Sequence, residues 1–145
     1  MTIDEAQVIL EELVNDLPER IFKDLNGGVL LLPKKKISPE AKKNDLYIMG
    51  EYCVSPNMGR MVKIYYGSIE AVYGENASER KWRRELRKTL HHELTHHLED
   101  LAGENDLVVE DEINMYLYKN DLPMGSIKSP KLGRYRYANE NKEIK

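Results

Sequence analysis

The motif H-E-x-x-H at positions 92–96 constrains this chain more than any other feature of its sequence. On a helix, two histidines four residues apart project from the same face, about one turn apart. Imidazoles in that arrangement can share one zinc ion, and the glutamate after the first can act on a water molecule bound to the ion. The motif therefore predicts a helix with His92 and His96 as metal ligands and Glu93 as the catalytic residue.

The size and composition of the chain indicate one globular domain. Its 145 residues are enough to bury a core without disulfides or a structural metal. The net charge of −3 argues against nucleic acid as a partner, and the single cysteine, Cys53, excludes an internal disulfide and fits a reducing compartment. With no apolar run of membrane-spanning length and no signal-peptide pattern, we expect a cytoplasmic protein that binds neither nucleic acid nor a membrane.

The first half of the chain predicts two helices followed by strands. Thr2–Glu5 reads as a capping box before apolar residues at helical spacing, and Pro18 suits the start of a second, short helix. Val29–Leu32 is expected to be a short strand buried on both faces, and the basic stretch Pro33–Asp45 an exposed loop.

Two further segments have the composition of paired strands. Leu46–Val54 and Arg60–Ile69 are rich in tyrosine and β-branched residues, and Pro56–Gly59 between them is a turn signal, so we expect a β-hairpin. A short helix is predicted over Ile69–Tyr73.

The longest predicted helix carries the motif. It begins after the N-cap Ser78 and ends near Ala102, because Gly103 is placed as its terminator. A leucine stripe runs along it, opposite to His92, through Leu86, Leu90, Leu94 and Leu98. A second helix is expected at 107–118, and residues 126–145 form a basic tail that we expect to be mobile, leaving 1–125 as one domain.

The third metal ligand is the open point of the predicted site. A catalytic zinc ion takes three protein ligands and keeps a fourth position for water. Glu99 lies on the histidine face, but the seven residues that separate it from His92 span about 10.5 Å of helix, too far for one ion. The ligand is therefore expected beyond the helix, from Asp106, Glu110 or Asp111. Asp106 could equally serve as the N-cap of the following helix.

The order of five segments around the motif resembles the minimal bacterial zincins, a family described as possible zinc metallopeptidases. The segments, within residues 5–112, are EELVNDLPERI, GGVLLLP, MGEYCVSP, VKIYYGSIE and LRKTLHHELTHHLE. The resemblance implies an α+β fold: a small zincin-like domain with a short mixed sheet packed on the active-site helix, with flanking helices. It also implies that an edge strand near the site binds extended substrate, a role that Arg60–Ile69 could fill.

The chain departs from that family after the second histidine. The family continues the motif as H-E-x-x-H-x-x-G-x-x-D, whereas this chain has Glu99 at the glycine and Ala102 at the aspartate. A four-residue insertion would restore the pattern as Gly103 and Asp106. The resemblance thus favours Asp106 as third ligand, whereas the geometry of a returning helix favours Glu110 or Asp111.

Together these patterns predict a zinc-dependent metallopeptidase that hydrolyses a peptide or protein substrate with Glu93 as general base. The alternative is a zincin-fold protein that binds metal for a regulatory or interaction role with little proteolytic activity, which the small size of the chain favours. A purely structural zinc site fits less well, because such sites usually have four ligands that include cysteine.

Overall fold

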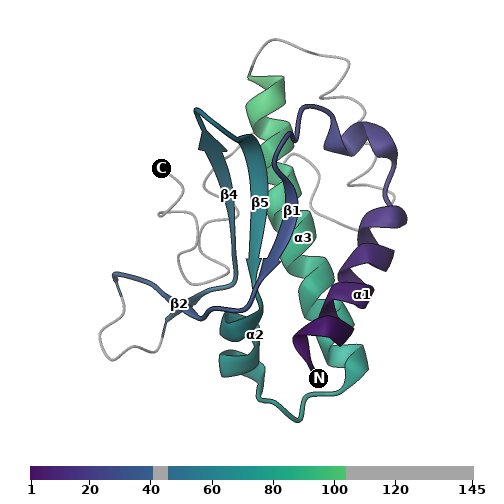
Figure 1. The fold of residues 1–145 in the computed structure, drawn as a ribbon, viewed down its shortest axis with the longest axis vertical. Coiled ribbons are helices and arrows are strands. Elements are labelled where there is room, and N and C mark those ends of the chain that lie inside the picture. Colours follow the sequence, from purple (N-terminus) through teal and green to yellow (C-terminus); the bar gives the residue numbers. More distant parts are fainter. Residues whose placement is uncertain (41–45, 104–145) are drawn as a thin grey trace.

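A small mixed sheet lies along the long helix that carries the motif (Figure 1). The structure, a computed structural model, describes residues 1–40 and 46–103. In chain order its elements are α1 (Ile3–Asn15), a 3-10 helix (Glu19–Phe22), β1 (Gly28–Leu32), β2 (Lys36–Ile37), β3 (Tyr47–Ile48), β4 (Gly50–Ser55), β5 (Gly59–Tyr65), α2 (Tyr66–Tyr73) and α3 (Glu79–Ala102). The described part is thus of the predicted α+β class.

The main sheet has the strand order β1-β5-β4. β4 and β5 form the predicted antiparallel hairpin, closed at Gly59, whose φ of +74° favours glycine. β1 pairs with β5 in parallel, from Gly28 opposite Met61 to Leu32 opposite Tyr65. β5 is therefore the central strand, and the expectation that Arg60–Ile69 supplies an edge strand is wrong. The strand also ends earlier than expected, because α2 begins at Tyr66.

The helix ends follow the local signals in the sequence. Thr2 and Glu5 form the predicted capping box of α1, each side chain bonding the other residue's backbone N–H. α3 has Ser78 as its N-cap and Gly103 as its C-cap, also as predicted. Short-range hydrogen bonds of this kind depend on neighbours in sequence, which is why the sequence predicts them well.

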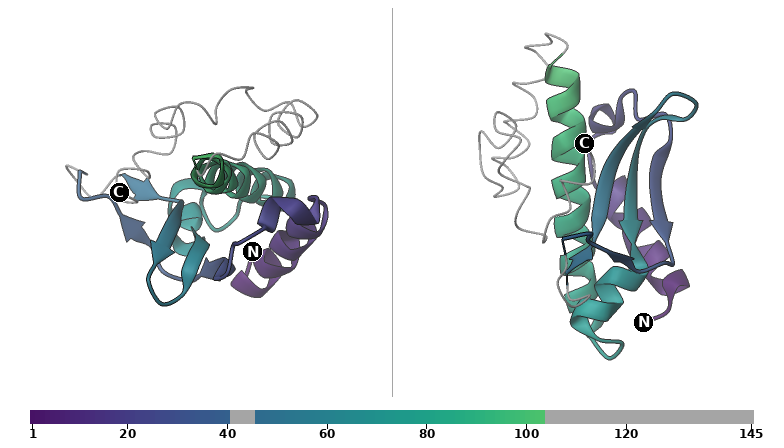
Figure 2. Two further views of the ribbon diagram at one scale, coloured as in Figure 1. Left: turned by 90° about the horizontal axis from the view of Figure 1, so that it is seen from above. Right: turned by 90° about the vertical axis from the view of Figure 1, so that its left-hand side faces the viewer.

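The core lies between α3, α1 and the inner face of the sheet. Figure 2 shows α3 running along one face of the sheet. The leucine stripe of α3 is buried, as predicted, and packs in one cluster with α1 and with residues such as Val62 and Ile64 of β5. Burial of this stripe holds the motif-bearing helix in place against the sheet.

Two expectations for the segments around the sheet are wrong. β1 is partly exposed at every residue rather than buried on both faces, because in the described part of the chain it is an edge of the sheet and pairs only with β5. The basic stretch 33–45 is not only a loop: Lys36 and Ile37 form β2 and pair with β3. The predicted helix at 107–118 and the tail 126–145 lie outside the described residues.

Candidate metal site

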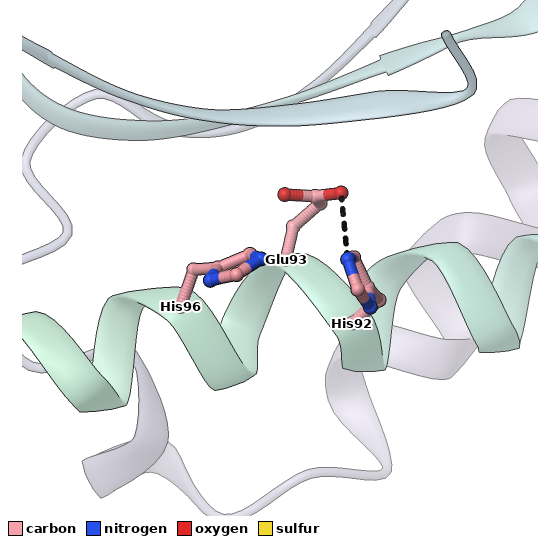
Figure 3. A group of neighbouring side chains, drawn as sticks. All are labelled: His92, Glu93 and His96. Atoms are coloured by element: carbon pink, nitrogen blue, oxygen red, sulfur yellow. Dashed lines mark ion pairs between the residues drawn. The ribbon is translucent and has the colours of Figure 1, made fainter. Parts of the chain in front are cut away.

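Three side chains of α3 come together at the motif. His92, Glu93 and His96 each offer a potential ligand atom, and these atoms lie within 4.8 Å of one another. The two imidazole rings are 4.9 Å apart between centroids and nearly perpendicular. Figure 3 shows the Glu93 carboxylate pointing from the helix toward the sheet, with one imidazole on either side. Helical spacing alone accounts for this grouping, which the sequence predicted.

The motif side chains are more buried than expected for residues on the helix face opposite the leucine stripe. Glu93 is fully buried, and the side chains of His92 and His96 are only 8% and 11% exposed. Within residues 1–40 and 46–103, neither carboxylate oxygen of Glu93 nor Nε2 of His96 has a hydrogen-bond partner. Buried polar atoms in that state are costly unless something binds them. These residues could therefore hold a metal ion.

Burial sets the electrostatics of Glu93. Loss of solvent raises the pKa of its carboxyl well above the usual range, and the negative charge of Glu51 raises it further. The His92 imidazole lies 4.0 Å from the carboxylate, measured from Nε2 to Oε2 (Figure 3). A cation at this position would offset the cost of the buried negative charge.

Strand β4 covers Glu93 at Gly50. A Cβ atom added to Gly50 would lie 2.7 Å from Thr89 Cγ2 and 3.2 Å from Glu93 Cγ, so only glycine lets strand and helix approach this closely. Gly50 was not among the residues that we expected at the site. A glycine inside the predicted strand Leu46–Val54 was the available signal.

The next residue of β4, Glu51, is a second buried carboxylate, which was not expected from the sequence. Because side chains alternate along a strand, it points to the face of the sheet opposite to the one Gly50 presents to α3. Lys36 Nζ contacts both of its oxygens at 2.8 and 2.7 Å, and the Tyr65 hydroxyl donates to Oε1 at 2.5 Å. These contacts fix β2 to the back of β4 and β5, behind the site.

Glu99 contacts the second motif histidine directly. Its Oε1 lies 3.0 Å from His96 Nδ1, the ring nitrogen on the side away from the unpartnered Nε2. From the sequence, Glu99 was expected on the histidine face but too far from His92 to share one ion with it. In the structure it is a hydrogen-bond partner of His96.

His97 belongs to a separate network that fastens α3 to the sheet. Its Nε2 donates to the Lys23 carbonyl at 2.8 Å, and its Nδ1 lies 3.0 Å from the Tyr52 hydroxyl. The Tyr52 hydroxyl donates its single proton to Asp100 Oδ2, which also accepts from Arg60 Nε at 2.7 Å. Burial lowers the pKa of the His97 ring below its usual value. The network connects α3 to β4, β5 and the segment after the 3-10 helix.

The residues proposed as third ligand, Asp106, Glu110 and Asp111, lie outside the described residues, so their roles stay predictions. Within the described ranges, the group that could hold a metal ion consists of His92, Glu93 and His96. In those same ranges, no helix has both the length and the apolar character needed to cross a membrane.

Comparisons with known proteins find a match among solved structures. No family model matches the sequence, and no curated protein matches it. A solved structure of a conserved hypothetical protein from Thermo thermophilus does match, with 33% sequence identity and a TM-score of 0.61. The match covers 71% of this chain and 99% of that one. The chain therefore belongs to the same family as this conserved hypothetical protein.

Proposed function

We propose that this protein is a zinc-dependent metallopeptidase with a zincin-like fold. His92, Glu93 and His96 would form the active site at which a peptide bond of the substrate is hydrolysed. The observation that carries the proposal is the group of three potential ligand side chains on one helix, with ligand atoms within 4.8 Å of one another. The buried Nε2 of His96 and carboxylate of Glu93, unpartnered within the described residues, support it, because a bound cation would satisfy them.

The donor set suits zinc. Zinc binds imidazole nitrogen well, and two histidines with a third ligand are a common catalytic arrangement. His92 and His96 would hold the ion, with the third ligand expected among Asp106, Glu110 and Asp111. Glu93 is not expected to be a ligand, because in H-E-x-x-H motifs the two histidines bind the zinc and the glutamate acts as general base.

Glu93 has the properties of a general base for this reaction. When bound, zinc would polarise the scissile carbonyl and lower the pKa of a water molecule to about 7. Glu93 accepts the proton of the attacking water and passes it to the leaving amine. Burial raises the pKa of the Glu93 carboxyl, which strengthens its hold on an accepted proton.

Strand β4 is the proposed docking strand for the substrate. In the part of the chain that the structure describes, β4 pairs only with β5, and it passes over Glu93 at Gly50. An extended peptide that pairs along the outer side of β4 would bring a peptide bond near Glu93. This strand takes the role that the resemblance to zincins suggested for Arg60–Ile69.

The test combines metal binding with peptide cleavage. We expect the full-length protein to bind about one zinc ion, measured by elemental analysis after dialysis, and to cleave members of a mixed peptide library, measured by mass spectrometry. His92→Ala and His96→Ala should lose both properties. Glu93→Gln should keep the zinc and lose cleavage, because the base is removed and the ligands stay.

His91→Gln is the matched control, because His91 is buried beside His92 on α3 but lies outside the group of three. It should keep both zinc and cleavage. Equal zinc content in the wild type and both alanine variants would contradict the metal site. Zinc binding through His92 and His96 with no cleavage of any peptide would favour the regulatory alternative.

A further inference from the structure

The contact between His96 and Glu99 determines which nitrogen of the His96 ring carries hydrogen. A carboxylate accepts hydrogen bonds and does not donate them, so the 3.0 Å contact at Glu99 Oε1 requires N–H at Nδ1 of His96. In the neutral ring, Nε2 then carries the lone pair. That atom is buried and, within the described residues, lacks a hydrogen-bond partner.

His97, the next residue, carries its ring hydrogen on the other nitrogen, Nε2. His97 Nε2 lies 2.8 Å from the Lys23 carbonyl oxygen, which can only accept, so its hydrogen is on Nε2. The Nδ1 of His97 faces the Tyr52 hydroxyl. Both nitrogens of His97 are thus engaged, whereas His96 has one nitrogen engaged by Glu99 and the other open toward Glu93 and His92.

We propose that Glu99 is the positioning residue of His96, holding its ring in the Nδ1–H tautomer and aiming the Nε2 lone pair at the metal. The inference rests on the proposed function in one respect, that His96 is a metal ligand. It assigns Glu99 to a second layer around the ion, because its carboxylate is occupied at the nitrogen that points away from the site.

Burial makes this contact effective. The side chains of His96 and Glu99 are 11% and 14% exposed, so water competes little for the hydrogen bond. The two residues are three apart on the uninterrupted helix α3, which keeps the carboxylate beside the ring whether or not an ion is bound. The ring is therefore oriented before binding, and less freedom is lost when the metal enters.

The experiment compares Glu99→Ala, Glu99→Gln and Asp100→Asn in the full-length protein. The tautomer of His96 is read from imidazole ¹⁵N chemical shifts of metal-free protein, and zinc affinity from competition with a chromogenic chelator. Glu99→Ala should shift neutral His96 toward the Nε2–H form and weaken zinc binding by about 10–100-fold. Glu99→Gln keeps an accepting oxygen, so it should retain the Nδ1–H form and recover most of the affinity.

Asp100→Asn is the control, because Asp100 is the adjacent carboxylate on α3 and contacts Tyr52 and Arg60 instead of a motif histidine. It should change neither the His96 tautomer nor the zinc affinity. An unchanged tautomer and affinity in Glu99→Ala would overturn the positioning role. A loss of binding beyond about 1000-fold in both Glu99 variants, with the tautomer unchanged, would make Glu99 a ligand and also overturn it.

The two proposals fail in distinguishable ways. If wild-type protein binds zinc through His92 and His96 and the Glu99 variants bind it equally well, only the positioning role is wrong. If wild-type protein binds no zinc at these histidines, the proposed function is wrong and the inference falls with it. If zinc binds and Glu99 acts as described but no peptide is cleaved, the inference stands without the peptidase activity.

Discussion

Gly50 lies directly against Glu93, so a Cβ atom at residue 50 would sit 3.2 Å from the Cγ of the glutamate. The same atom would be 2.7 Å from Thr89 Cγ2 and 3.1 Å from the Lys63 carbonyl oxygen. The start of β4 therefore forms the wall of the site above Glu93. Any side chain at residue 50 must move the strand or the helix, and with it the carboxylate.

Gly50→Ala should destabilise the protein by about 1–3 kcal/mol, because the added methyl group overpacks a closed contact. Chemical denaturation measures the change. Thr89→Ser removes the methyl group at the shortest contact, so the double variant should recover part of the loss. Gly103→Ala is the control: its Cβ would meet ordinary contacts at 3.4 Å and should cost much less. Equal losses in Gly50→Ala and Gly103→Ala would contradict the close contact.

Tyr52→Phe should cost about 1–3 kcal/mol of folding stability, because it removes the hydroxyl between His97 and Asp100 and leaves His97 Nδ1 buried without that partner. Thermal unfolding at constant pH measures it. Tyr47→Phe, at a half-buried tyrosine of β3, should change stability by no more than about 0.5 kcal/mol. A similar small effect at Tyr52 would show that the network contributes little to holding α3.

Asp100 should make the stability of the protein depend on acid pH. Although burial alone would raise it, hydrogen bonds from Arg60 and Tyr52 bring the pKa of Asp100 below its usual value. The folded state therefore binds this proton more weakly than the unfolded chain. The associated stability is present above the unfolded pKa, near pH 4, and is lost as the pH falls toward the folded pKa. Unfolding free energies of the wild type should fall across this window more steeply than those of Asp100→Asn, and parallel curves would contradict the assignment.

Removal of metal should leave the fold intact. The core of α1, α3 and the sheet is formed by apolar side chains and does not include the motif histidines. Protein treated with a chelator should keep its helical circular dichroism and a cooperative melt. Added zinc should stabilise it by about 2.7 kcal/mol at a free concentration 100 times the Kd. A chelated chain that is unfolded at room temperature would show that the metal is structural, which counts against the peptidase proposal.

Local sequence patterns determined the helices and the arrangement of the motif. The caps of α1 and α3, from Thr2, Ser78 and Gly103, depend on hydrogen bonds between residues a few positions apart. The grouping of His92, Glu93 and His96 follows from the pitch of one helix in the same way. Such features need no knowledge of the rest of the chain, so the sequence alone predicted them.

Only the tertiary structure decided what surrounds the motif. Strand order depends on pairing between distant segments, and β1 pairs with β5 across more than 30 positions of sequence, which made β5 central against expectation. The closeness of Gly50 to Glu93 likewise depends on how the sheet packs on α3. Glu99 lies on the same helix as His96, but helical spacing alone does not determine which atom its side chain contacts. In the structure, its carboxylate contacts Nδ1 of the His96 ring. Non-local packing therefore determined how His92, Glu93 and His96 are enclosed, while helix geometry had already determined that these three side chains lie together.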